Sequence, residues 1–355
     1  PRTSSAASDV YKRQMYNISY MNPYATRDGV SLGYNLYFRE TDYGEFNVAN
    51  YLTNSNGFGA QFGYPISDIT RLGFNITYDK TDIDVGSLPA REIYDFVSAE
   101  GNIFETLSAQ LSWQRVTLNR GLFPTDGAST VLSFSSTIPG SDLSYYRLNV
   151  RQRYYQPLTQ NLVFGFQGEL GYLNAYGDTE ETPFFQNFYA GGPRSLRGFE
   201  SNTLGPRSTD APCYEFNYAE GTCPNLLDID GDGELDTPYY NPYANQTSRY
   251  RDAPIGGNIK IEGSLQLIFK LPFIEDQRSL RSAFFFDFGN VFSDNCKEYQ
   301  INCSEPSIDD LRYSYGVGIT WITGFGPMSL AIAKPTNAGP RERTEEFQFT
   351  VGNVF

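Results

Sequence analysis

The chain has 355 residues, of which 16% are aromatic, with 27 tyrosines, 27 phenylalanines and no histidine. Its formal net charge of -14 argues against a nucleic-acid partner, because nucleic-acid binding needs a basic surface. No stretch approaches the roughly 20 apolar residues of a membrane-spanning helix, so if the chain crosses a bilayer it must do so as a closed sheet.

Segments in which apolar and polar residues alternate recur along the chain. Between residues 258 and 270, for example, Ile259 and Ile261 alternate with Lys260 and Glu262. This pattern is typical of strands with one face in lipid and the other in a polar interior. It predicts thirteen strands, at residues 15–22, 30–40, 57–66, 70–80, 104–116, 129–138, 145–156, 161–173, 258–270, 280–292, 311–322, 326–335 and 345–355.

The connections between these strands alternate between short turns, such as residues 65–68 and 157–160, and longer acidic loops. Outer-membrane barrels place short turns on the periplasmic side and long loops outside the cell. The alternative is a large soluble β-sandwich or β-helix with long loops, which would not require this alternation. The longest connection, residues 174–256, is too long for an idle loop and is expected to carry function.

The first residues carry neither a strand pattern nor the apolar core of a signal peptide. The run 4–14 resembles translated adapter sequence. We therefore expect residues 1–14 to be an artefactual, unstructured leader and residues 15–355 to form the membrane domain.

Within the longest loop, Leu196-Arg197-Gly198-Phe199 follows Ala190-Gly191-Gly192-Pro193. This stretch resembles the (V/L)RGF loop of the BamA family, whose members fold and insert β-barrel proteins into the bacterial outer membrane. Further motifs resemble the same family in its order: NPY at 22–24, DGVSLG at 28–33, FPTDG at 123–127, IPGSD at 138–142, FFFDFG at 284–289 and EFQF at 346–349.

The resemblance implies a transmembrane antiparallel β-barrel of the outer-membrane assembly type, with a long loop inserted into its lumen. In this family POTRA domains precede a barrel of sixteen strands, so the chain is expected to begin within the fourth strand and to contain about thirteen. The implied location is the bacterial cell outer membrane. The implied partners are outer-membrane lipids, unfolded barrel clients and the lipoproteins of the assembly machinery.

Arg197 is expected to hold the loop in the lumen, because a buried guanidinium needs a carboxylate partner. Asp287 lies between the lipid-facing Phe286 and Phe288, so alternation places it inside the barrel. The family also implies an acidic partner on the preceding strand. Here Gln266 stands at that position and Glu262 lies elsewhere on the same inward face, which leaves the second contact open. The alternative is a solvated arginine in an exposed loop.

By this resemblance, the barrel is expected to act by opening the seam between its first and last strands. The weakly paired last strand would contain Phe347, Phe349, Gly352 and Phe355. Nothing resembles a nucleophile with its base or a cofactor-binding loop, so no enzymatic activity is expected. The alternatives are a TamA-like assembly protein or a two-partner secretion transporter, which share an RG-aromatic loop, and a passive porin-like channel.

The four cysteines lie in predicted loops as two local pairs, Cys213 with Cys223 and Cys296 with Cys303. They predict two disulfides formed in an oxidising periplasm. A zinc site, the alternative, is disfavoured by the lack of histidine.

The long loop also contains acidic residues at calcium-binding spacing. Carboxylates at the first, third, fifth and ninth positions, with Gly233 at the sixth, resemble the start of an EF-hand loop. Tyr239 stands where such a loop offers its bidentate glutamate, so weak calcium binding is expected. An acidic surface loop is the alternative. The proposed ligands are Asp228, Asp230, Asp232, Asp236 and the backbone carbonyl of Glu234.

Overall fold

The computed structural model describes residues 13–43, 48–49, 51–85, 90–209, 253–272, 274, 279–300, 303–324 and 326–352. In this part of the chain thirteen strands form one sheet with neighbours in chain order, and every pairing is antiparallel. The strands are β1 (Arg13–Asn22), β2 (Ser31–Asp42), β3 (Tyr51–Ser67), β4 (Thr70–Val85), β5 (Ile103–Val116), β6 (Gly127–Thr137), β7 (Tyr145–Thr159), β8 (Leu162–Ala175), β10 (Ile259–Phe269), β11 (Leu280–Phe292), β12 (Arg312–Thr323), β13 (Gly326–Pro335) and β15 (Phe347–Val351).

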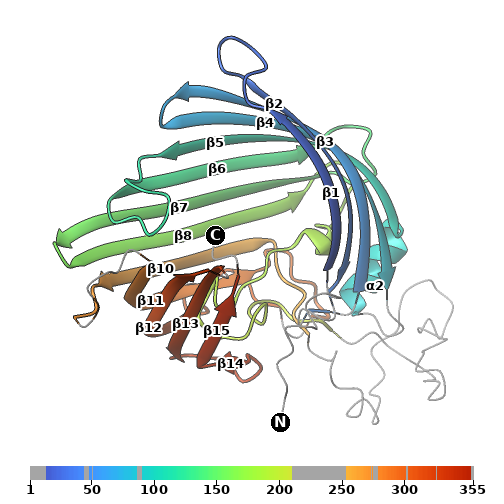
Figure 1. Ribbon diagram of the computed structural model, residues 1–355. Helices are drawn as coiled ribbons and strands as arrows, with labels where there is room; N and C mark the ends of the chain where they lie inside the picture. The colour runs from blue at the N-terminus through green and yellow to red at the C-terminus, as the bar shows by residue number, and fades with distance from the viewer. Residues whose placement is uncertain are drawn as a thin grey trace.

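The sheet is strongly curved, with β1 and β15 at its two edges (Figure 1). Its two faces differ as the alternation predicts. On β11, Phe284 is 52% exposed on the outer face, whereas Asp287 on the inner face is 0% exposed. A curved sheet with an apolar outer surface and polar residues inside is the wall of a transmembrane β-barrel. The predicted fold class and the thirteen predicted strands are confirmed.

Several strand boundaries differ from the sequence prediction. β3 begins at Tyr51 and β4 ends at Val85, several residues beyond the predicted ends. β1 begins at Arg13, where Arg13 and Gln14 pair with β2, so these two residues belong to the sheet and not to the expected leader. The physical reason is that backbone pairing continues beyond the bilayer, where neither face contacts lipid and the alternation is lost. Residues 1–12 lie outside the described residues.

Four short elements were not predicted. They are helix α2 (Arg91–Glu100), the 3₁₀ turn η2 (Phe184–Gln186), and the paired strands β9 (Gly198–Phe199) and β14 (Thr344–Glu345). Among the described residues, no helix has both the length and the apolar character needed to span a bilayer.

The long-loop end of the barrel carries a cap formed by α2, η2 and the extended ends of β3 to β5. Its core includes Tyr51, Ile93, Phe96 and Phe104, which pack with Phe184 of η2. Because these residues are distant in the sequence, packing in the tertiary structure and not local helix propensity stabilises the short helix α2.

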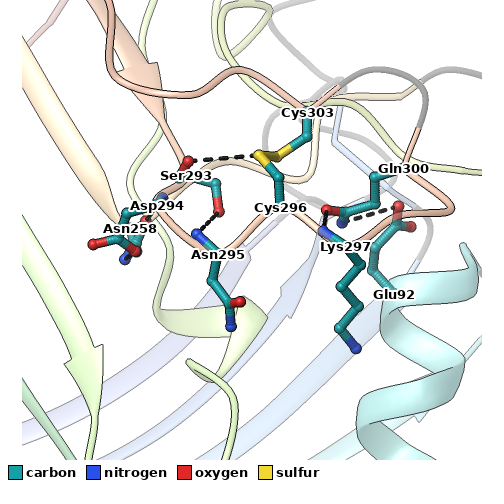
Figure 2. Close-up of a disulfide and its surroundings, with 9 residues drawn as sticks. All are labelled: Glu92, Asn258, Ser293, Asp294, Asn295, Cys296, Lys297, Gln300 and Cys303. Atoms are coloured by element: carbon teal, nitrogen blue, oxygen red, sulfur yellow. Dashed lines mark hydrogen bonds between the residues drawn. A yellow bond between two sulfur atoms is a disulfide. The ribbon is translucent and has the colours of Figure 1, made fainter.

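A disulfide joins Cys296 and Cys303 in the β11–β12 connection, with 5.7 Å between the two Cα atoms, and confirms the second predicted pair. The residues that it encloses contact the cap (Figure 2). The Gln300 amide donates a hydrogen bond to Glu92 of α2 at 3.3 Å, and the Tyr299 hydroxyl donates to Asp95 at 2.8 Å. The other predicted pair, Cys213 with Cys223, lies outside the described residues.

Candidate functional site

The segment that follows β8 returns to the inner wall of the barrel through a tight turn. Gly191 and Gly192 both have a φ of +103°, a conformation that glycine adopts without strain. The Ser195 N–H donates to the Gly192 carbonyl at 3.1 Å, and the Gly191 N–H donates to Ser195 Oγ at 2.9 Å. This turn directs residues 195–199 along the inner faces of the last strands of the sheet.

Arg197 forms a bidentate ion pair with Asp287 of β11. Its Nε donates to Oδ2 and its Nη2 to Oδ1, each at 2.7 Å, and its backbone N–H donates to Oδ2 at 3.2 Å. The guanidinium carbon also lies 3.4 Å from the centroid of the Phe285 ring, a cation–π contact. The Arg197 side chain is 16% exposed and that of Asp287 is 0% exposed. The predicted partner of Arg197 is therefore correct, and the solvated arginine is excluded.

Two glycines on the inner face of β12 leave space for this pair. A Cβ at Gly316 would lie 2.7 Å from the Phe285 ring, and a Cβ at Gly318 would lie 3.6 Å from Nη1 of Arg197. A larger residue at position 316 would clash with the Ile332 carbonyl of β13 and with the ring on which the guanidinium lies. The lack of a side chain at Gly316 and Gly318 is therefore part of the site.

The second contact of Arg197 is with a serine and not with an acid. Nη2 donates to Ser264 Oγ of β10 at 3.0 Å, and the Gln266 amide donates to the same oxygen at 3.2 Å. Glu262 instead accepts a hydrogen bond from Ser195 Oγ. The second contact, which the sequence left open, is thus made by Ser264, the inward residue level with the guanidinium. Glu262 holds the loop through Ser195, whereas Gln266 reaches Arg197 only through Ser264.

Glu262 belongs to a row of charges on the inner wall. Lys260 Nζ lies 3.0 Å from Glu262 and 3.6 Å from Glu169 of β8, and Arg151 of β7 lies 3.1 Å from Glu169. Alternating charges compensate one another, so the carboxylate that holds Ser195 is itself paired. The loop is thus held by two carboxylates, through Arg197 and through Ser195.

Gly198 lies flat against the inner wall. Its φ is +91°, and a Cβ there would be 3.2 Å from the Cβ of Ala333 on β13. A larger residue would therefore be both strained and crowded. With Phe199 it forms β9, which pairs with Thr344 and Glu345 of β14.

Phe199 is an apolar anchor with 0% exposure. It lies in a buried cluster contributed by the loop and the barrel wall, together with Leu173, Phe188, Ala190, Leu196, Leu204 and Val291. The RGF tripeptide therefore combines a charged contact, a close backbone contact and a buried aromatic ring.

The last strand, β15, pairs with β13 at five positions, from Ile332 opposite Phe347 to Met328 opposite Val351. Phe347 and Phe349 point outward and are exposed, and the Gly352 N–H donates to the Pro327 carbonyl at 3.0 Å. Phe355 lies outside the described residues. The proposed calcium ligands Asp228, Asp230, Asp232, Glu234 and Asp236 also lie outside them, and that site stays a prediction.

Sequence reasoning missed three side chains of this site: Phe285, Ser264 and Gln348. Gln348 is 2% exposed and contacts the backbone of the RGF tripeptide from β15. All three were within reach of the alternation rule. Residues two apart in a strand lie on the same face of the sheet, so Phe285 points inward like Asp287, and Ser264 points inward like Glu262. Gln348 lies between two outward phenylalanines and therefore points inward as well.

A strongly curved antiparallel sheet with an apolar outer face and an internal loop locked by a buried ion pair defines an outer-membrane β-barrel protein. Residues 3–355 match the Omp85 superfamily domain, and the chain belongs to this superfamily. The outer membrane protein assembly factor BamA of Neisseria meningitidis serogroup B is 28% identical over 367 residues, which cover 96% of this chain and 41% of that protein. BamA of Nitratidesulfovibrio vulgaris is 22% identical and is covered to 36% of its length.

Solved structures agree with this assignment. BamA from Haemophilus ducreyi lacking POTRA domains 1–3 has a TM-score of 0.77 and 26% identity, and the match covers 96% of this chain and 62% of that one. CdiB from Escherichia coli, with a TM-score of 0.54 and 10% identity, shares the fold alone. The resemblance to the BamA family is confirmed, and the chain is a protein of the bacterial outer membrane. It spans less than half the length of the two curated BamA relatives.

Proposed function

We propose that this chain is the membrane barrel of an assembly factor that folds and inserts other β-barrel proteins into the bacterial outer membrane. Its proposed clients are unfolded outer-membrane barrels, and its proposed partners are outer-membrane lipids and the lipoproteins of the assembly machinery. The observation that carries the proposal is the bidentate Arg197–Asp287 pair, which fixes residues 195–199 of the long loop inside the barrel.

The proposed action is mechanical and involves no covalent step. An exposed strand edge presents unpaired N–H and C=O groups, and an incoming strand can pair with them by β-augmentation. A seam next to a five-residue last strand is suited to this, because a short ladder can be opened with few hydrogen bonds lost. The locked loop would hold the inner wall in register while the seam is closed.

A chimera tests this function. Residues 13–355 would replace the matching barrel segment of Neisseria meningitidis BamA, in a strain from which the native protein can be depleted. The expected result is continued assembly of outer-membrane barrels on depletion, with loss of that activity for Arg197→Ala and retention for Arg194→Ala, whose side chain is exposed in the same loop.

A chimera that folds into the membrane but assembles no clients would contradict the proposal. Steady ion conductance across planar bilayers would then favour the porin-like channel. Export of a co-expressed passenger protein would favour a two-partner secretion transporter. A TamA-like role would appear as assembly of only a subset of barrels.

A further inference from the structure

One side chain of the last strand holds the RGF tripeptide from the opposite side to Arg197. Gln348 Oε1 accepts a hydrogen bond from the Gly198 N–H at 3.3 Å, and Gln348 Nε2 donates to the Phe199 carbonyl at 2.8 Å. A carboxamide offers one donor and one acceptor to a backbone, as a neighbouring strand would. Because Gln348 is 2% exposed, water cannot readily replace it as the partner of these backbone groups.

The tripeptide therefore connects two strands that are not neighbours in the sheet. Arg197 is bound to Asp287 of β11, while Gly198 and Phe199 are bound to Gln348 of β15, and β12 and β13 lie between them in the sheet. Across this interval Gly198 lies against Ser314 of β12 and Ala333 of β13. The loop thus forms a brace across four neighbouring strands at the edge of the barrel wall.

In the described part of the chain, the hydrogen-bonded ladder that holds the last strand is short. β13 pairs with β12 at ten positions, whereas β15 pairs with β13 at five. Immediately before β15, β14 is itself paired with β9 of the loop, and the Glu200 N–H donates to the Arg343 carbonyl at 3.0 Å. Both the entry into the last strand and its inward face are therefore attached to the loop.

We propose that Gln348 couples the Arg197–Asp287 ion pair, which locks the loop, to the order of the last strand, β15. Release of Arg197 from Asp287 frees the tripeptide, and β15 then loses its internal support. Conversely, displacement of β15 withdraws the donor and the acceptor that hold Gly198 and Phe199. A coupling of this kind is reciprocal by thermodynamic necessity. Gln348 is a positioning residue, and only the biological use of this coupling, in opening the seam, rests on the proposed function.

Hydrogen exchange of the chain in lipid nanodiscs, read by mass spectrometry, tests the coupling. The variants are Arg197→Ala, Gln348→Met and Gln348→Glu, with Arg194→Ala as the matched control. Methionine preserves the length of the side chain without its hydrogen-bonding groups. Glutamate retains the acceptor for Gly198 and places a second oxygen against the Phe199 carbonyl.

Arg197→Ala and Gln348→Met are each expected to accelerate exchange in β15 by about tenfold, within the usual range of coupling between sites. Exchange in β4 and β7 should not change. Gln348→Met should also expose residues 190–206 to added protease, although it leaves the Arg197–Asp287 pair chemically intact. Combining the two substitutions should accelerate exchange in β15 by less than the product of the single effects, because both break the same brace.

The coupling is refuted if Arg197→Ala loosens the loop while β15 exchanges at the wild-type rate, or if Gln348→Met leaves both segments unchanged. Should Gln348→Met fail to fold, as judged by heat-dependent mobility on gels, Gln348→Glu carries the same test, with exchange in β15 again expected to be faster than in the wild type. Exchange is measured without clients. A chimera inactive in assembly with coupled exchange would therefore overturn the proposed function and leave the coupling in place.

Discussion

Replacing Arg197 by alanine removes the charged part of the loop lock while leaving the barrel strands unchanged. The substitution breaks both 2.7 Å hydrogen bonds to Asp287, the 3.0 Å bond to Ser264 and the contact with the Phe285 ring. It leaves a carboxylate with 0% exposure without its charged partner. We expect the main cost to come from this stranded charge and not from the lost contacts themselves.

Removing one partner of a buried ion pair costs about 3 to 5 kcal/mol. Two features of the structure place the expected loss near the lower end. The backbone N–H of residue 197 still donates to Asp287 at 3.2 Å, and the Arg197 side chain is 16% exposed, so water can reach the vacated space. The expected decrease in the free energy of unfolding is therefore about 3 kcal/mol.

Urea unfolding in detergent micelles, followed by the fluorescence of the two tryptophans, measures this quantity. Arg194→Ala is the control and should change the free energy by less than about 0.5 kcal/mol, as is usual for an exposed surface position. The double variant Arg197→Ala with Asp287→Ala removes the stranded charge and should be less destabilised than Arg197→Ala alone. A loss no larger than that of Arg194→Ala, or a double variant that is destabilised at least as much as Arg197→Ala alone, would refute the reasoning.

The remaining predictions concern the loop wall and the long-loop end. Glu262→Ala should release Ser195 and expose residues 190–196 to protease more than Gln266→Ala does, because of these two residues only Glu262 contacts the loop directly; equal effects would contradict this. Replacing Cys296 and Cys303 by serine should increase proteolysis of α2 in the folded barrel, and no change would show that the enclosed ring does not hold the cap. Burial raises the pKa of Glu92, so its contribution to stability is fully present below its unfolded pKa and is lost as the pH rises through its folded pKa. Protection of α2 should therefore weaken from acidic to neutral pH, and Glu92→Gln should abolish that dependence. Millimolar calcium should protect residues 210–252 from protease in the wild type and not in Asp230→Asn; protection of both would reduce the motif to an acidic loop.

The sequence by itself determined which face each strand residue takes. Apolar alternation is imposed by the bilayer, so it identified the thirteen strands and placed Asp287 inside between two outward phenylalanines. The lock then followed from chemistry, since a buried guanidinium needs a carboxylate and Asp287 was the inward acid of the neighbouring motif. Where the strands leave the bilayer this constraint ends, and there the boundaries at Tyr51, Val85 and Arg13 were misjudged.

Only the tertiary structure decided how far along each strand the loop makes contact. The alternation of the strand places Glu262, Ser264 and Gln266 on the same inward face. The path of the loop after its glycine turn decides that Arg197 contacts Ser264 and that Ser195 contacts Glu262. The same holds for Gln348, whose inward direction could be read from its neighbours but whose partners are 149 and 150 residues away in the sequence. Such contacts depend on strand register and on loop trajectory, which many weak long-range interactions fix together and no local pattern encodes.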